Sequence, residues 1–184
     1  GRFGERHLVE THLIPIVLQV ASGERESMQI YGDDWPTPDG TCIRDYIHVC
    51  DLVAAHWSAL AYLRGGGAAT TLNCGYGRGF SVLDVIETVK RVSGADFKVE
   101  FAGRRAGDPA QIVAACDHVR STLGWQPQFD DLPTIVAHAL AWTGVEELVL
   151  VDPDSHGVEN TYRHVQGRQG WGAAKVTGLK ELLQ

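Results

Sequence analysis

Apolar and polar positions follow helical and strand spacings in turn along the first 142 residues of the chain. Between residue 11 and Gly23 the spacing predicts an amphipathic helix, because the apolar residues recur on one face: Leu13, Ile14, Val17, Leu18 and Ala21. Met28 to Tyr31 alternate as in a short strand. Residues 32–40 contain Pro36, Pro38 and Gly40, so we expect a long shaped loop there.

Similar short elements are expected through the rest of this region. Strands are predicted at 45–49, 70–73, 97–101 and 112–115, and helices follow Asp51, Ser81, Asp117 and Asp131, ending near Leu63, Val92, Gly124 and Trp142. Asp51, Ser81 and Asp117 are residue types that cap helices. The pattern predicts a mixed α/β fold with short strands and no internal repeat.

The character of the sequence changes after residue 142. Residues 145–151 form an isolated apolar patch, and residues 157–172 are polar and rich in glycine. Such composition does not support a second core. We therefore expect a domain at 1–142 and an atypical, weakly ordered tail at 143–184.

Composition excludes several classes of function. The net charge of -7 argues against general nucleic-acid binding, which needs surplus Lys and Arg. The apolar stretch from Leu13 to Ala21 contains Pro15 and Gln19 and is too short to cross a membrane. The four cysteines show no metal-ligand spacing with each other or with histidines, so buried thiols in a reducing cytosol are expected, and no metal site.

Residues 70–101 imitate a nucleotide-binding βαβ unit. The glycine turn at 75–79 lies between a predicted strand and a predicted helix. Phe80, however, stands where the dinucleotide fingerprint needs its third glycine for close helix packing. We therefore expect a plain glycine turn that enters a capped helix.

Two loops each combine an arginine with an aspartate. Arg44 precedes Asp45, and Arg105 lies three residues before Asp108. Two converging guanidinium groups suit a diphosphate, and a carboxylate such as Asp108 can accept hydrogen bonds from ribose hydroxyls. The alternative, which the residues alone favour, is a pair of structural Arg–Asp ion pairs.

Several strings carry a resemblance to a known family. The longest is YGDDWPTPDGTCIRDYIHVCDL at 31–52; the others are GERHLVETHLIP at 4–15, LNCGYGRGFSV at 72–82, RRAGDP at 104–109 and LGW at 123–125. Over roughly residues 1–142 the chain resembles UDP-glucose 4-epimerase. The resemblance implies the substrate-binding, carboxyl-terminal portion of an extended short-chain dehydrogenase/reductase, with most of the Rossmann sheet absent.

The same resemblance implies an activity and partners. The family interconverts UDP-galactose and UDP-glucose through an NAD-dependent 4-keto intermediate, in the cytoplasm and as homodimers. This chain would supply the UDP-hexose half-site. The alternatives are a fragment of another nucleotide-sugar 4-epimerase or 4,6-dehydratase, and a non-catalytic nucleotide-binding module.

The resemblance also assigns substrate-binding residues. Arg44 and Arg105 would clamp the diphosphate, and Asp108 would accept from the ribose. The remaining implied residues are those of the uracil slot, Gln29, Ile30 and Tyr31, and those that touch the nucleotide partly through the backbone, Thr11, His12 and Leu13. His12 replaces an asparagine, and Ile112 a tyrosine, found in some members.

No catalytic or NAD-binding residue is assigned to this chain. The family's base belongs to a Tyr-x-x-x-Lys pair, and no tyrosine here is followed by a lysine four residues later. We therefore expect no turnover by the chain itself. We also expect apolar surfaces meant for the absent sheet, such as one face of residues 13–20, to be exposed.

Overall fold

The computed structural model describes residues 9–143, so the predicted tail beyond residue 143 lies outside the described residues. The chain divides into two compact units. Within the described range, the first unit consists of residues 9–29, 85–100 and 136–143, and the second of residues 30–84 and 101–135.

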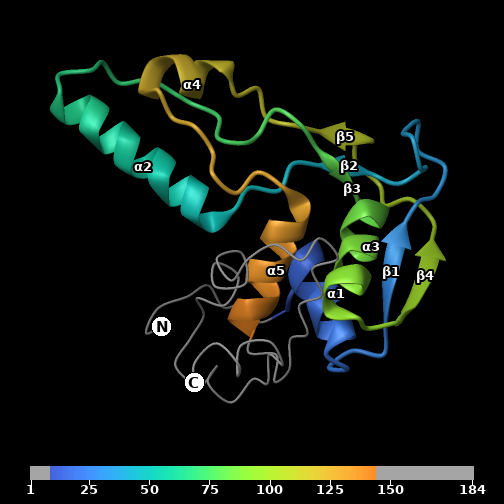
Figure 1. The fold of residues 1–184 in the computed structure, drawn as a ribbon. Coiled ribbons are helices and arrows are strands. Elements are labelled where there is room, and N and C mark those ends of the chain that lie inside the picture. The colour runs from blue at the N-terminus through green and yellow to red at the C-terminus, as the bar shows by residue number, and fades with distance from the viewer. Residues whose placement is uncertain (1–8, 144–184) are drawn as a thin grey trace, which may run out of the picture. The chain divides into compact units, whose positions relative to one another are not determined.

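The fold is mixed α/β, as the sequence predicts (Figure 1). The helices are α1 (Leu13–Ala21), α2 (Val49–Arg64), α3 (Val82–Ser93), α4 (Asp117–Leu123) and α5 (Leu132–Thr143). The strands are β1 (Ser27–Tyr31), β2 (Ile43–Arg44), β3 (Phe80–Ser81), β4 (Lys98–Ala102) and β5 (Gln111–Ile112). β1 pairs with β4, and the second sheet has the order β3-β2-β5.

The core of the first unit is built from the apolar faces of its helices and of β1. Its buried side chains include Val17, Leu18, Val20, Met28, Val85, Ile86, Val89 and Leu140. The expectation that the apolar face of residues 13–20 is exposed is therefore wrong: Val17 is 0% exposed, and Leu18 and Val20 are each 4% exposed. Burial of this face in the unit's own core is the physical reason.

In the second unit, much of the exposed apolar surface lies on α2. Among the large apolar side chains that remain exposed are five on this helix: Val49, Val53, Trp57, Leu60 and Leu63. No helix in the described part of the chain is long and apolar enough to span a membrane.

The small sheet of the second unit joins segments that are distant in sequence. β2 runs antiparallel to β3, with Arg44 opposite Phe80, and parallel to β5, with Arg44 opposite Ile112. The backbone N–H of Ile43 also donates to the carbonyl of Ala110 at 2.9 Å. The loop that carries Arg105 and Asp108 is thereby anchored, at its far end, next to Arg44.

One of the three predicted caps is confirmed. Ser81 Oγ accepts from the N–H of Asp84 at 2.9 Å, while Asp84 Oδ2 accepts from the N–H of Ser81 at 3.0 Å. This reciprocal pair is a capping box for α3. At the start of α5, Asp131 Oδ1 accepts from the N–H of Thr134 at 2.8 Å, a cap that was not predicted.

The other two predicted caps are wrong. α2 begins earlier, and His48 is its N-cap, with Nδ1 accepting from the N–H of Cys50 at 3.1 Å. Asp51 lies in the first turn of that helix and is 2% exposed. For α4 the N-cap is Cys116, and Asp117 is the first helical residue.

Three predicted strands are also misplaced. Residues 45–49 are irregular up to the start of α2, because the carboxylate of Asp45 accepts from the N–H of Ala114 at 2.8 Å and His48 starts the helix. Residues 70–73 have no regular structure, and the strand predicted at 112–115 is only Gln111–Ile112. β-Branched composition favours a strand but does not supply its hydrogen-bonding neighbour.

Candidate functional site

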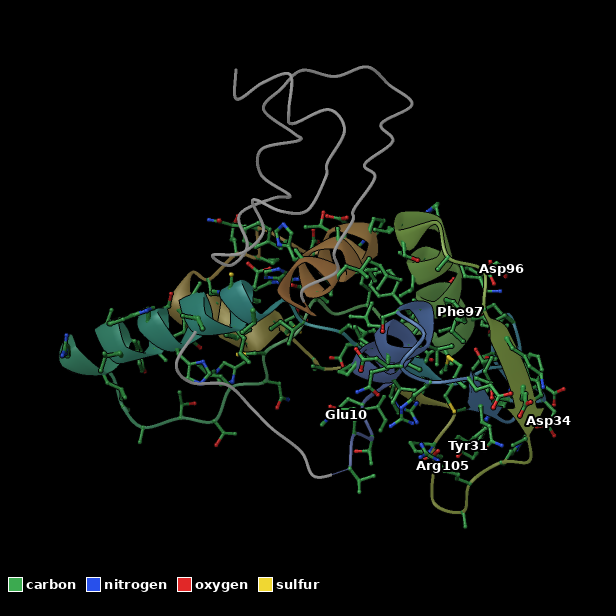
Figure 2. All side chains as sticks on the ribbon, turned by 90° about the horizontal axis from the view of Figure 1, so that it is seen from below. Glu10, Tyr31, Asp34, Asp96, Phe97 and Arg105 are labelled. Carbon is green, nitrogen blue, oxygen red and sulfur yellow. The ribbon has the colours of Figure 1, made fainter. Side chains whose placement is uncertain are left out.

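Three of the predicted site residues meet in the second unit. The guanidinium carbon of Arg105 lies 4.6 Å from the ring centroid of Tyr31. Arg105 Nε also donates to Asp108 Oδ2 at 3.0 Å. Figure 2 shows Tyr31 and Arg105 in the same region of the molecule, near the end of β1. The side chain of Arg105 remains 59% exposed, so it faces solvent as well as these two partners.

The ion-pair alternative thus holds for Arg105 in this structure. Because only Nε is used by Asp108, both terminal nitrogens of Arg105 make no hydrogen bond within residues 9–143. These two nitrogens are the fork that suits phosphate oxygens. The guanidinium covers one face of the ring of Tyr31, a residue of the predicted uracil slot.

Arg44 behaves differently from Arg105. It lies on β2, and its Nη1 donates to the carbonyl of Ile43 at 2.7 Å. No carboxylate pairs with it among the residues that the structure describes, and Asp45 is used by Ala114. The structural ion pair between Arg44 and Asp45 is therefore wrong. Its convergence with Arg105 on one diphosphate stays a prediction.

The start of α1, in the first unit, carries Thr11, His12 and Leu13. The carboxylate of Glu10 accepts from the N–H groups of Thr11 and His12, each at 2.8 Å, and contacts His12 Nδ1 at 2.7 Å. These hydrogen bonds to His12 lower the pKa of Glu10. The backbone donors predicted to touch a nucleotide are thus held by an acidic side chain of the same chain.

The predicted uracil slot is divided between exposed and buried residues. Gln29 and Tyr31 are exposed on β1, whereas the side chain of Ile30 is 2% exposed and belongs to the core. Alternation along the strand explains the difference, because successive side chains point to opposite faces. Ile30 could meet a base only through its backbone.

A second cluster, not predicted from the sequence, supports the Arg105 loop. Arg104 Nε donates to Asp34 Oδ1 at 2.6 Å, and its guanidinium carbon lies 4.1 Å from the ring centroid of Trp35. Trp35 Nε1 donates to the carbonyl of Tyr31 at 3.1 Å. The only sequence signals for this cluster were the paired arginines at 104 and 105 and an aromatic residue within the 32–40 loop.

Two glycines allow the 32–40 loop to close in this way. A Cβ on Gly32 would lie 2.4 Å from Trp35 Nε1 and 2.8 Å from Arg104 Cγ, and Gly32 has φ of 91°. A Cβ on Gly40, with φ of 81°, would lie 2.0 Å from the carbonyl oxygen of Asp33. Only glycine fits both the backbone conformation and the close approach.

The predicted glycine turn at 75–79 precedes the capped helix α3, and two of its glycines allow close packing. A Cβ on Gly79 would lie 2.4 Å from Ile43 Cγ2, and one on Gly75 would lie 2.8 Å from Asp45 Oδ2. These glycines admit neighbouring segments of the same chain, where a dinucleotide cradle would leave room for phosphates. The turn at 75–79 therefore does not fit a dinucleotide, and we assign no NAD contact to it.

The half-buried Tyr46 and the buried Tyr76 are poor candidates for a base. Burial raises the pKa of Tyr46 to about 12. Burial also raises the pKa of Tyr76 above its usual value, and its hydroxyl donates to the buried Asp51 at 2.7 Å. An efficient general base has a pKa near the working pH. The Tyr76 hydroxyl has a structural role, because it also accepts from the N–H of His48 at 2.9 Å.

Other features of the described region do not add to this site. A surface pocket of about 420 Å³ is lined by Arg120, Gly124, Trp125, Gln126 and Pro127, none of which is a predicted site residue. No cluster of three or more potential metal ligands occurs within residues 9–143. The four cysteines are free thiols, and Cys50 is exposed, contrary to the expectation of burial.

Comparisons with known proteins give this geometry a context. The family model described as GDP-mannose 4,6 dehydratase matches residues 1–136. UDP-glucose 4-epimerases of Halalkalibacterium halodurans and Streptococcus mutans are each 51% identical to the chain over 142 residues. These matches cover 77% of this chain but only 42% and 43% of the two relatives. The chain thus spans about two-fifths of the length of the curated relatives it matches.

Solved structures agree with the sequence matches. A crystal structure of a UDP-glucose 4-epimerase aligns with a TM-score of 0.72 at 52% identity, covering 74% of this chain and 42% of that one. The Brucella ovis enzyme, in complex with NAD, aligns with a TM-score of 0.71 at 42% identity, covering 76% and 43%. The Bifidobacterium longum enzyme, in complex with NAD+ and UDP, gives 0.63 at 35% identity, covering 70% and 38%.

Proposed function

Because this chain belongs to the family described as GDP-mannose 4,6 dehydratase, we propose that it carries the UDP-hexose half-site of a UDP-glucose 4-epimerase. Curated relatives at about half identity bear that name, and one solved neighbour is a complex with UDP. Residues 1–142 are the proposed nucleotide-sugar-binding part, and 143–184 a separate tail. The whole protein would interconvert UDP-galactose and UDP-glucose in the cytoplasm, as a homodimer.

The observation that carries the proposal is the state of Arg105. Asp108 and the ring of Tyr31 hold the guanidinium, and its two terminal nitrogens remain available. A charge-assisted hydrogen bond from such a group contributes about 1.5 to 3 kcal/mol. Arg105 would bind one phosphate of UDP, and Asp108, beside it, would accept from the ribose.

Arg44 is proposed as the second cation of the diphosphate clamp. The parallel pairing of β2 with β5 ties Arg44 to the chain that follows Asp108, and the Ile43–Ala110 hydrogen bond closes that tie. The nucleotide contacts of Thr11, His12, Leu13, Gln29 and Ile30 are proposed with it. Backbone contacts near residues 11 and 12 require Glu10 to release the two N–H groups that it now holds.

Catalysis is proposed to need residues that this sequence does not contain. NAD, bound by other residues, would accept the hydride from the sugar, since relatives of known structure are complexes with NAD. The chain has no Tyr-x-x-x-Lys pair, and its glycine turn is filled by its own side chains. Its own residues would bind and orient the UDP-hexose, and the chain would be inactive by itself.

Calorimetric titration with UDP tests the half-site. The chain should release heat on binding UDP, and Arg105→Ala should abolish it. Arg64→Ala, which removes an exposed arginine at the end of α2, is the matched control and should leave the isotherm unchanged. Equal binding of UDP by the unmodified chain and by Arg105→Ala would reject the assignment.

Two further measurements bound the proposal. Parallel titration with GDP separates a uridine nucleotide site from the guanosine preference that the matched family's description suggests. Incubation of the purified chain with NAD and UDP-galactose should yield no UDP-glucose. Measurable conversion would overturn the claim that the chain is inactive by itself.

A further inference from the structure

We propose that Arg104 is a positioning residue, which fixes the 103–109 loop against the 32–40 loop so that Arg105 presents its guanidinium at one place. The inference rests on the proposed function, because it assigns the support of the same UDP site. Arg104 Nε donates to Asp34 Oδ1 at 2.6 Å, and the terminal Nη2 donates to the carbonyl of Asp34. Its guanidinium also stacks on Trp35 at 4.1 Å.

Arg104 lies between two backbone hydrogen bonds that anchor the ends of its loop. The N–H of Gly32 donates to the carbonyl of Ala102 at 2.8 Å, and the N–H of Ile43 donates to Ala110 at 2.9 Å. Between these two anchors, Arg104 hydrogen-bonds to Asp34 and stacks on Trp35, both in the 32–40 loop. The hydrogen bonds and ring stacking of Arg104 with Asp34 and Trp35 form a latch between the two loops. Arg105 follows Arg104 directly in sequence, so the latch fixes the backbone from which the Arg105 side chain extends.

Both groups that stack in the latch, the Arg104 guanidinium and the Trp35 indole, are planar, so their contact fixes the orientation of Arg104. A guanidinium can stack on an indole with its face and donate from its edge at the same time. Trp35 is itself oriented, because its Nε1 donates to the carbonyl of Tyr31 and its N–H donates to the carbonyl of Gly40 at 2.9 Å. The same Tyr31 lies beneath Arg105. Arg105 therefore contacts Tyr31 at one end of the segment 31–35, and Arg104 contacts Asp34 and Trp35 at the other end.

The side chains of the Arg104–Asp34 ion pair are partly exposed, so the pair is expected to position the loop without stabilising the whole fold. The side chains of Arg104 and Asp34 are 41% and 69% exposed, and exposed ion pairs add little to the stability of a fold. Loss of Arg104 should therefore leave thermal unfolding nearly unchanged. It should disturb the loop locally, and with it the alignment of Arg105.

The first arm of the test is UDP titration of a double-mutant cycle. Arg104→Ala should weaken UDP binding roughly tenfold, about what poor alignment of one charge-assisted hydrogen bond costs. Asp34→Ala should weaken it by less, because the carbonyl of residue 34 and the Trp35 ring still hold Arg104. The double variant should be no weaker than Arg104→Ala, because the Asp34 carboxylate acts through Arg104. Arg104→Lys should recover only part of the affinity, since lysine lacks the planar fork. Arg64→Ala is the charge-matched control.

Direct contact between Arg104 and the phosphate would give a different pattern. Asp34→Ala would then leave UDP affinity unchanged or raise it, and that result would overturn the proposal. The proposal would also be overturned if Arg104→Ala lost as much free energy of unfolding as free energy of UDP binding. Arg104 would then support the whole fold.

The second arm needs no ligand and separates this inference from the proposed function. Arg104→Ala should accelerate amide hydrogen exchange at Gly32 and Trp35 and leave the rate at Leu52, inside α2, unchanged. If the unmodified chain released no heat on titration with UDP, the proposed function would be rejected. The hydrogen-exchange measurement would still test whether Arg104 holds the 32–40 loop. Unaltered exchange at Gly32 and Trp35 would refute it.

Discussion

Replacing Asp51 with alanine is expected to destabilise the second unit more than any other single change to an aspartate there. The residue is 2% exposed in the first turn of α2. Its carboxylate accepts from the hydroxyl of Tyr76 at 2.7 Å and from the N–H groups of Gln128 and Phe129 at 2.8 and 3.0 Å. One side chain thus joins a helix start, residue 76 and the chain before α5.

The magnitude follows from the donors that would lose their acceptor. The Tyr76 hydroxyl keeps a second acceptor, the carbonyl of Phe129 at 3.1 Å, so the N–H groups of Gln128 and Phe129 are the two donors left without a partner. Each such donor costs about 1 to 3 kcal/mol. We expect Asp51→Ala to lower the free energy of unfolding by about 3 to 5 kcal/mol, at the upper end of single-site effects. Asp51→Asn should cost about 1 to 3 kcal/mol, because its amide N–H₂ would face at least one of these donors.

Urea unfolding followed by far-ultraviolet circular dichroism measures the effect, with the midpoint and slope fitted separately. Asp96→Ala is the matched control, because that side chain is 96% exposed and pairs only with Lys90; it should change stability by less than about 0.5 kcal/mol. A loss below about 1 kcal/mol for Asp51→Ala, at unchanged slope, would refute the reasoning.

Three further predictions concern single residues. Gly79→Ala should lower the melting temperature, with a cost of about 1 to 3 kcal/mol by thermal unfolding, because its Cβ would lie 2.4 Å from Ile43 Cγ2. Although burial raises the pKa of Asp39, hydrogen bonds from Ser81 and from residue 41 lower it overall, below the ordinary 3.8. Its stabilisation is therefore complete above about pH 4 and is lost below 3.8, and Asp39→Asn should flatten acid unfolding in that window. Cys50, exposed, should react with a thiol reagent before the other cysteines do.

Sequence reasoning succeeded where the signal was local. The helical spacing around Leu13 predicted α1, and Ser81 predicted the start of α3, because both depend on residues within one or two turns. The fold class and the family resemblance are likewise confirmed by the structure and by the relatives.

It failed where the partner lies far along the chain. Asp51 is of a capping type and precedes an apolar run, so a cap was the local expectation. Its actual partners lie 25 to 78 residues away, and nothing near it in sequence announces them. The strand predicted at 70–73 failed for a related reason, since a strand exists only with a neighbour that the local composition cannot name.

The candidate site shows the same division. The motif at 104–109 identified Arg105 and Asp108, whose ion pair spans three residues. The contribution of Arg104 depends on Asp34, 70 residues earlier, and was missed.

The stacking of Arg105 on Tyr31 changes how nucleotide affinity should be understood. A uracil ring that stacks on that face of Tyr31 must displace the Arg105 guanidinium. The net gain in binding free energy is therefore smaller than for stacking on an unoccupied ring. At exposed positions a contact of this kind contributes about 0.5 to 1 kcal/mol, equivalent to roughly a two- to fivefold difference in dissociation constant. The departing cation is the same group that is proposed to receive the phosphate, so release from the ring and capture of the ligand would be one movement.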